Sequence, residues 1–294
     1  MQVPLKEAFD DNFFLTKEYA TFCSKSTGIL LEEEWISQQK VYLLKHKNIA
    51  VSNYDEDLVK EFKKNKIRFM QVSDKLNTYE KDPSLIEYAI FHKKSYEEAV
   101  QNYKHSFKEG LRQSKKYPLS VTKVKKPTEH QLAEAYKVYR KQMKRLNSFA
   151  YPQSYFQAFI QMSTASLFLV YYQQQVTSYA FCFENKKNFY FSISGSDQEY
   201  FKYRVTNRLY DAVIHYACEQ GLTIHFGTGI RGSGYQKFKE NAGALIYKCE
   251  RFPNDERYIR AATNTLKFKG TGLVLRSLSK LFPKRVIYTT MPTT

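Results

Sequence analysis

The sequence predicts an α/β (α+β) fold in which helices cover a mixed β-sheet. Three strand-like runs lie between 165 and 194 and are separated only by short polar turns, which is typical of an antiparallel meander. An amphipathic helical pattern follows over 205–220. The next segment, 221–244, is predicted as a short strand, a glycine-containing loop and a short helix, and a last strand follows over 244–252. Strands and helices in this order indicate one sheet with helices packed against it.

The first hundred residues alternate helical and strand-like patterns and contain no recognisable catalytic motif. We expect a helix over 13–37 and a charged amphipathic helix over 55–64. The expected strands are 41–44 and 49–51, which would form a hairpin around Lys47-Asn48, followed by 67–72 and 85–92.

Two long helices are expected between this part and the meander. The first covers 95–116, with Ser95 as its N-cap and Glu98 completing a capping box. A strand over 119–124 separates it from the second helix, which is expected over 128–145. The outer faces of both helices are basic, so they are candidates for contact with an anionic partner.

Positive charge is concentrated in the later part of the chain. Residues 1–100 contain 15 Lys and Arg against 17 Asp and Glu, whereas 101–294 contain 31 against 12. Within that part, 101–145 contain 13 basic and three acidic residues, and 257–294 contain eight basic and no acidic residues. The tail also places leucines along one face over 273–282, which is typical of a basic amphipathic helix. The electrostatic field of so many basic residues attracts phosphates, tRNA or an anionic membrane. Solvated helix faces, and a tail helix docked on the core, would give the same sequence pattern.

Composition narrows the class of protein. No apolar run is long enough to cross a membrane, and the first residues lack the pattern of a signal peptide, so a cytoplasmic protein is expected, with peripheral membrane contact through the tail. The four cysteines are widely separated and have no histidine at metal-ligand spacing. We expect reduced, buried thiols and no metal site; the cysteines are Cys23, Cys182, Cys218 and Cys249.

The glycine-rich segment allows more than one interpretation. Gly227-x-Gly229-x-x-Gly232 has the spacing of a dinucleotide-binding fingerprint, and Glu250 lies where an acidic ribose ligand is expected. However, only 44 residues follow Glu250, without further βα units to complete a doubly wound sheet. A second interpretation makes the glycines a surface turn and Lys239 a solvated charge.

A third interpretation rests on resemblance to a known family. A strand ending in Phe-Gly, a Gly/Ser loop and then Phe-Lys-x-x-x-Gly-Ala resembles the C-terminal signature of FemABX-like proteins. These form a branch of the GNAT acyltransferase superfamily that builds peptidoglycan interpeptide bridges. The matching residues are Phe226-Gly227, Gly232-Ser233-Gly234, Phe238-Lys239 and Gly243-Ala244. His225 stands where relatives often carry Asp.

The resemblance extends over about residues 105–250, because the order of elements before the meander is similar too. It implies two tandem GNAT-like lobes with a diverged first lobe. The expected division is 1–100 for the diverged lobe, 101–256 for the acyltransferase lobe and 257–294 for a basic tail.

The resemblance also implies a function in cell-wall biogenesis. The favoured hypothesis is transfer of an aminoacyl or acyl group to an amine of a cell-envelope precursor, with aminoacyl-tRNA as donor and a nucleotide- or lipid-linked acceptor. An acyl-CoA-dependent N-acyltransferase of an amino sugar or amino acid is the alternative. It is less favoured because 196–204 lack the glycines with which acyl-CoA members of the superfamily hold a pyrophosphate. A non-enzymatic protein that binds tRNA or membrane is the third hypothesis, and none of the three requires a cofactor.

Site residues are assigned through the same resemblance. The Phe238-Lys239 pair would lie at the reaction centre, where Lys239 would face the developing oxyanion. No Ser-His-Asp or Cys-His motif is present, so a covalent enzyme intermediate is not expected. The remaining candidates would bind substrate from the glycine loop or from the basic helices; they are Arg231, Gly232, Ser233, Gly234, Tyr235, Arg112, Lys116 and Arg145.

Overall fold

The computed structural model describes most of the chain up to residue 252. The described residues are 8–9, 16–27, 31–36, 39–44, 48–52, 56–64, 68–76, 86–92, 94–146, 148 and 150–252. The predicted tail, 257–294, and its amphipathic helix lie outside them.

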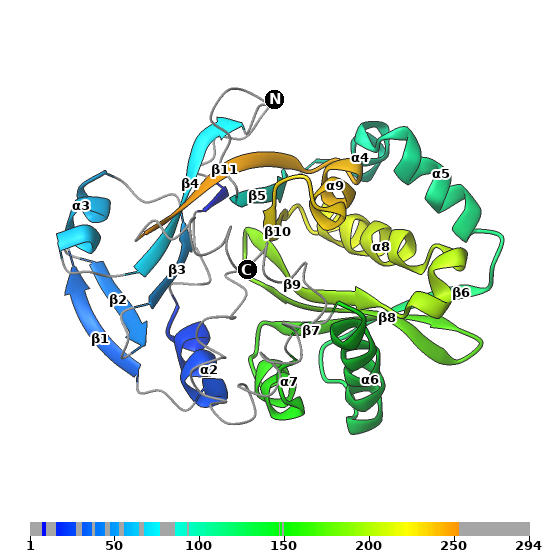
Figure 1. Ribbon diagram of the computed structural model, residues 1–294, viewed down its shortest axis with the longest axis horizontal. Coiled ribbons are helices and arrows are strands. Elements are labelled where there is room, and N and C mark those ends of the chain that lie inside the picture. The colour runs from blue at the N-terminus through cyan, green and yellow to red at the C-terminus, as the bar shows by residue number, and fades with distance from the viewer. Residues whose placement is uncertain are drawn as a thin grey trace.

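The described strands form one eleven-stranded sheet in the order β1-β2-β3-β4-β11-β5-β10-β9-β8-β7-β6 (Figure 1). The strands are β1 (Leu31–Ile36), β2 (Gln39–Leu44), β3 (Asn48–Ser52), β4 (Arg68–Leu76), β5 (Ile86–Phe91), β6 (Leu119–Val124), β7 (Ala165–Tyr172), β8 (Gln175–Glu184), β9 (Asn188–Ser196), β10 (Thr223–Ile230) and β11 (Leu245–Phe252). The helices are α2 (Lys17–Thr27), α3 (Glu56–Lys64), α4 (Tyr96–Asn102), α5 (His105–Ser114), α6 (Glu129–Arg145), α7 (Gln153–Ile160), the 3-10 helix η2 (Gln198–Tyr203), α8 (Val205–Glu219) and α9 (Gly234–Asn241).

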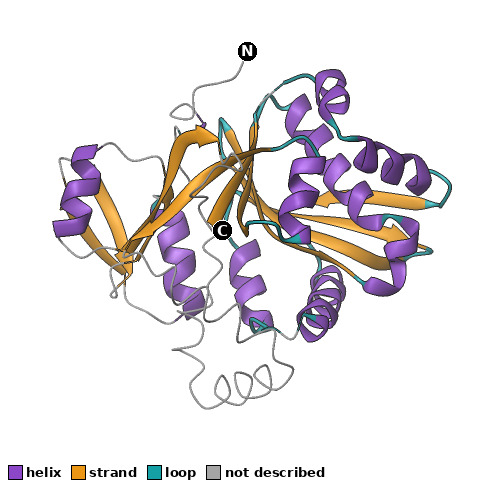
Figure 2. Cartoon of the chain, turned by 45° about the horizontal axis from the view of Figure 1, so that its top comes forward, coloured by secondary structure: helices purple, strands orange, loops and turns teal. Residues whose placement is uncertain are grey.

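The predicted α/β fold is therefore confirmed. Strands β6 to β9 form the expected antiparallel meander, and β10 lies beside β9 in the parallel direction. In Figure 2 the strands run through the molecule as one layer between two sets of helices.

Helices cover both faces of the central strands. Along β7, Leu167 and Leu169 pack in the core beneath α2, α6 and α7, whereas Phe168 and Val170 pack beneath α4, α5 and α8 (Figure 1). Because successive side chains of a strand point to opposite faces, a nearly continuous apolar run is what a doubly covered strand requires.

The strands of the first hundred residues continue the same sheet. Strand β11 lies between β4 and β5, and β5 pairs antiparallel with both β10 and β11. The last described strand therefore connects the two parts of the sheet, and β5 reaches the glycine-rich segment directly. The boundary at 100/101 stays a prediction.

Two expected elements are wrong in detail, and one helix is missed. The helix over 13–37 is α2 followed by β1, so 31–36 are a strand paired with β2. The meander is preceded by α7, which the sequence analysis does not anticipate. The glycine loop is partly strand, because β10 continues through Gly227 and Gly229 as far as Ile230.

The expected single helix over 95–116 is divided into α4 and α5. Its capping box forms as expected, with Ser95 accepting from the Glu98 backbone and Glu98 from that of Ser95. The break occurs at Tyr103, which is 3% exposed and donates its hydroxyl to Asp211 on α8 at 3.1 Å. Tyr103 also takes an extended conformation there, so this long-range contact accompanies a change of direction that local periodicity does not reveal.

Candidate active site

The two central parallel strands separate where the site begins. Pairing between β9 and β10 covers Thr223 to His225 on one strand and Asn188 to Tyr190 on the other. Beyond these residues, and within the described part of the chain, β9 pairs only with β8 and β10 only with β5. A wedge with unpaired strand edges therefore opens between the two strands.

A β-bulge marks the point of separation on β10. The register with β5 shifts between His225 and Gly227, so Phe226 is the additional residue. Gly227 has a φ of 72°, a conformation that residues with a Cβ rarely adopt. Bulges bend a strand and turn its backbone groups, and this one accompanies the departure of β10 from β9.

Helix α9 follows the end of β10 after a short turn. Gly232 has a φ of 73°, and Ser233 is the N-cap, whose hydroxyl accepts from the Gln236 backbone at 3.2 Å. Residues three apart share one helix face, so Gln236 and Lys239 both point toward β10 and are 2% and 0% exposed. The side chains that α9 buries against the strand are therefore polar.

The Lys239 ammonium lies on the backbone of the bulge. Its Nζ donates to the carbonyl of Thr228 at 2.9 Å and to that of Gly227 at 3.2 Å. The same atom lies 4.3 Å from the centre of the Tyr235 ring, which is 45% exposed. As an ammonium, Lys239 has three N–H groups, and these two hydrogen bonds leave one for another partner.

Burial lowers the pKa of Lys239 from 10.5 to about 7, and the nearby Glu87 opposes this decrease. Glu87 is a buried residue of β5 that stands opposite Gly229 in the sheet. Near neutral pH, Lys239 is therefore divided between its charged and neutral forms. The interpretation of Lys239 as a solvated charge is wrong.

Aromatic side chains surround the other side of α9. Phe238 packs against Phe107 and Tyr210, with ring centres 5.5 and 4.9 Å away. The Tyr210 ring is also stacked on Phe226 at the bulge. Phe238 thus holds α9 against the core, and its position fixes the direction in which Lys239 points.

The structure brings the glycine-loop candidates together with Lys239. Gly232 and Ser233 form the turn and cap, Gly234 begins α9, and Tyr235 covers the lysine. Arg231 directly follows β10 and is partly buried. No contact among the described residues assigns a ligand to them, so their substrate-binding roles stay predictions.

The three basic candidates on the helices lie elsewhere. Arg112 is exposed and forms two 2.8 Å hydrogen bonds with Glu109 of its own helix. Lys116 is exposed beyond the end of α5, and Arg145 lies over the Phe201 ring at 5.4 Å. No hydrogen bond or ion pair within the described ranges joins these residues to Lys239. They are therefore candidates for binding substrate on the outer surface only, away from Lys239.

Sequence reasoning misses two polar residues beside Lys239. Glu87 lies in an apolar strand, and an acidic residue in such a run is the signal that could have identified it. Gln236 is three residues before Lys239, and the helical spacing could have placed it on the same face.

His225 has a local role in the sheet. Its Nδ1 accepts from the Tyr88 hydroxyl at 3.1 Å, and its Nε2 donates to the Ala8 carbonyl at 2.7 Å. Burial lowers the pKa of His225 to about 3, so the ring is neutral.

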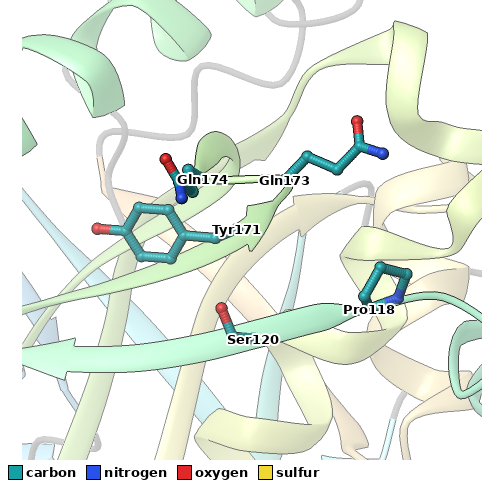
Figure 3. Close-up of a pocket in the computed structure, with 5 residues that line it drawn as sticks. All are labelled: Pro118, Ser120, Tyr171, Gln173 and Gln174. Carbon is teal, nitrogen blue, oxygen red and sulfur yellow. The ribbon is translucent and has the colours of Figure 1, made fainter.

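A separate groove of about 560 Å³ lies at the edge of the sheet. Figure 3 shows Ser120 and Tyr171 on neighbouring strands, with Gln173 and Gln174 at the turn that follows β7 and Pro118 before β6. Strands β8 and β9 separate this groove from β10. It is therefore not part of the site around Lys239.

Other classes of site find little support. The dinucleotide interpretation is wrong, because Gly227 and Gly229 are strand residues and β10 and β11 both run antiparallel to β5. Cys182 and Cys249 are buried and outside any disulfide, as expected, whereas Cys218 is only partly buried. In the described ranges, no group of three or more His, Cys, Asp or Glu could hold a metal ion, and no helix is long and apolar enough to span a membrane.

Comparison with known proteins agrees with this geometry. Residues 101–240 match the family described as acetyltransferase (GNAT) domain, whereas no curated protein matches the chain in sequence. The crystal structure of FemX has a TM-score of 0.61 at 13% identity, covering 84% of this chain and 94% of FemX. The structure of L-PGS from Bacillus licheniformis has a TM-score of 0.54 at 10% identity, covering 91% and 96%.

A third similar structure is the C-terminal domain (DUF2156) of a proposed lysylphosphatidylglycerol synthetase from Agrobacterium fabrum. Its TM-score is 0.55 at 10% identity, covering 88% of this chain and 94% of that domain. At such identities the likeness is one of fold, and the family match supplies the class of activity. The chain is therefore an acyltransferase whose residues 101–240 match the GNAT acetyltransferase domain and whose fold is similar to that of FemX.

Proposed function

We propose that this acyltransferase moves an aminoacyl group from aminoacyl-tRNA to an amine of a cell-envelope precursor, with Lys239 at the reaction centre. The observation that carries the proposal is the buried ammonium of Lys239, held on the Gly227 and Thr228 carbonyls with one N–H left over. A positioned N–H donor on a buried side chain stabilises a developing oxyanion more than it could in bulk solvent.

The proposed reaction needs no covalent enzyme intermediate. The neutral amine of the acceptor attacks the ester carbonyl of the donor, and the carbonyl oxygen becomes an oxyanion that accepts from the Lys239 Nζ. Collapse of this intermediate breaks the ester bond and forms an amide. The amine loses a proton and the 3′ oxygen of the tRNA gains one, so the step is balanced.

Two features favour an aminoacyl donor over acyl-CoA. The segment before α8 is the 3-10 helix η2, which contains no glycine and leads directly into α8. The similar structures include FemX and a domain named for lysylphosphatidylglycerol, which is an aminoacylated lipid. The acyl-CoA-dependent N-acyltransferase remains the alternative for an amino sugar or amino acid acceptor. The non-enzymatic hypothesis is not kept, because the family match indicates an acyltransferase.

The basic helices offer a surface for the tRNA. Lys115 and Lys116 are exposed where α5 ends, and Lys108 is exposed on the same helix. An anionic lipid-linked acceptor would be attracted by the same charge, and the tail at 257–294 would extend the contact to a membrane surface.

Binding of charged tRNA tests this proposal through its dependence on salt. Changing Lys115 and Lys116 to glutamine is expected to weaken binding severalfold and to reduce the slope of log K against log salt by about 1 to 2, because each phosphate contact contributes about 0.7. Fluorescence anisotropy at several salt concentrations measures both quantities. Lys186→Gln, an exposed lysine in the β8–β9 turn, is the control and should bind like the wild type.

The alternative gives a different result. Acetyl-CoA would raise the melting temperature of the wild type while charged tRNA would not, at low or at high salt. That outcome would contradict the proposed donor.

A further inference from the structure

Gln236 carries a buried side-chain amide that the fold does not use. The residue is 2% exposed, and neither its Oε1 nor its Nε2 has a hydrogen-bond partner among the described residues. Most buried side-chain polar atoms are paired, because an unpaired one loses its hydrogen bonds to water and gains none in the protein. A carboxamide with both ends unpaired therefore needs an explanation.

The fold makes space for this amide beside Lys239. A Cβ on Gly229 would lie 2.0 Å from the Gln236 Oε1, so a side chain there would displace the amide from its present position. Gly229 is the second residue beyond Gly227, whose carbonyl accepts from Lys239. The amide and the ammonium thus lie along consecutive residues of β10, at the wedge where it has left β9.

Gln142 on α6 is a comparison for Gln236, because its side-chain amide is hydrogen-bonded at both ends. Its Nε2 donates to the Ser194 carbonyl at 3.2 Å and its Oε1 accepts from the Tyr179 hydroxyl at 2.8 Å. Gln142 therefore shows how the fold uses a side-chain amide for structure, and Gln236 is not used in that way.

We infer that Gln236 binds substrate by pairing with the carbonyl and the N–H group of an amino-acid unit. Its Nε2 donates to the carbonyl and its Oε1 accepts from the N–H. An aminoacyl ester and a peptide acceptor both present this pair, whereas an acetyl group presents only the carbonyl. Gln236 thereby selects amino-acid substrates over simple acyl groups, since the acetyl group would leave Oε1 buried and unpaired.

This inference rests on the proposed function, and Gln236→Met tests it through two separate properties. The first is stability without substrate. Removing an unpaired amide is expected to leave the melting temperature unchanged or to raise it. Gln142→Met is expected to lower it, because it leaves the Ser194 carbonyl and the Tyr179 hydroxyl without their partners.

The second property is substrate binding. Gln236→Met is expected to raise KM about tenfold for the substrate that carries the amino-acid unit, at little cost in kcat, as for one or two lost hydrogen bonds. A rise in the KM for the donor would identify the aminoacyl group as the ligand of Gln236. A rise in the KM for the acceptor would identify the peptide as that ligand. Unchanged KM values for both substrates would overturn the inference, as would a loss of stability equal to that of Gln142→Met.

Binding without turnover separates this inference from the proposed function. The probes are an alanyl group joined by an amide to the 3′ position of adenosine, and N-acetylalanine N-methylamide. At least one should raise the melting temperature of the wild type but not of Gln236→Met. If no donor supports transfer, the proposed function fails while this result still stands. If neither probe shifts the wild type, the assignment of Gln236 is wrong.

Discussion

Replacing Lys239 with methionine is expected to lower kcat about 100- to 1,000-fold. The substitution keeps a buried side chain of similar length but removes the N–H that remains after the bonds to Gly227 and Thr228. Loss of one oxyanion donor has an effect of this size in other acyl-transfer enzymes. KM should change little, because the lost interaction forms mainly in the transition state. Transfer rates at saturating donor and acceptor measure both constants.

The matched control is Lys237→Met on the same helix. Lys237 is exposed and only two residues away, so a general effect of charge on α9 would appear in both variants. A Lys239→Met enzyme that keeps more than a tenth of wild-type kcat would contradict the proposed role. A large fall in melting temperature, with kcat preserved in the folded fraction, would instead assign Lys239 to bracing the bulge.

The second large effect concerns stability as a function of pH. Burial gives Lys239 a pKa of about 7 in the folded protein, below its ordinary value of 10.5. Between these two values the unfolded chain binds more protons than the folded chain, so the free energy of unfolding rises with pH. Below about pH 7 both states are protonated at this residue, and its contribution no longer changes.

Comparison with Lys239→Met isolates this contribution. From pH 7 to pH 9, the wild type should gain about 2 kcal/mol of unfolding free energy relative to the variant, since a full proton difference corresponds to about 1.4 kcal/mol per pH unit. Urea unfolding at several pH values measures the difference, and other titrating groups cancel between the two proteins. Parallel pH profiles would show that the ammonium is not buried as described.

Much of the fold follows from local patterns in the sequence. The meander, β6, α6, α8 and α9 form close to their expected positions, because their apolar periodicity matches the faces that they bury. The division at Tyr103 depends on a contact with Asp211, more than a hundred residues away. Such a contact overrides helix propensity and leaves no local signal. The extension of β10 to Ile230 similarly depends on pairing with β5.

The site is only partly contained in local patterns. The family resemblance leads to Lys239 and to Ser233 as site candidates, and both lie where the bulge and α9 meet. Burial of Lys239, the approach of Glu87 and the unpaired amide of Gln236 arise only when β5 and α9 pack against β10. These features set the charge and the polarity of the site, so its chemistry required the tertiary structure.

The central claim is that the Lys239 site transfers an aminoacyl group, and a single-turnover transfer assay tests it most directly. Labelled aminoacyl-tRNA and labelled acetyl-CoA are offered separately to the same peptide-bearing envelope precursor, at low salt and again at higher salt. We predict amide formation from aminoacyl-tRNA, weaker at higher salt and lost in Lys239→Met. Transfer from acetyl-CoA alone, or equal transfer by the wild type and Lys239→Met, would contradict the account.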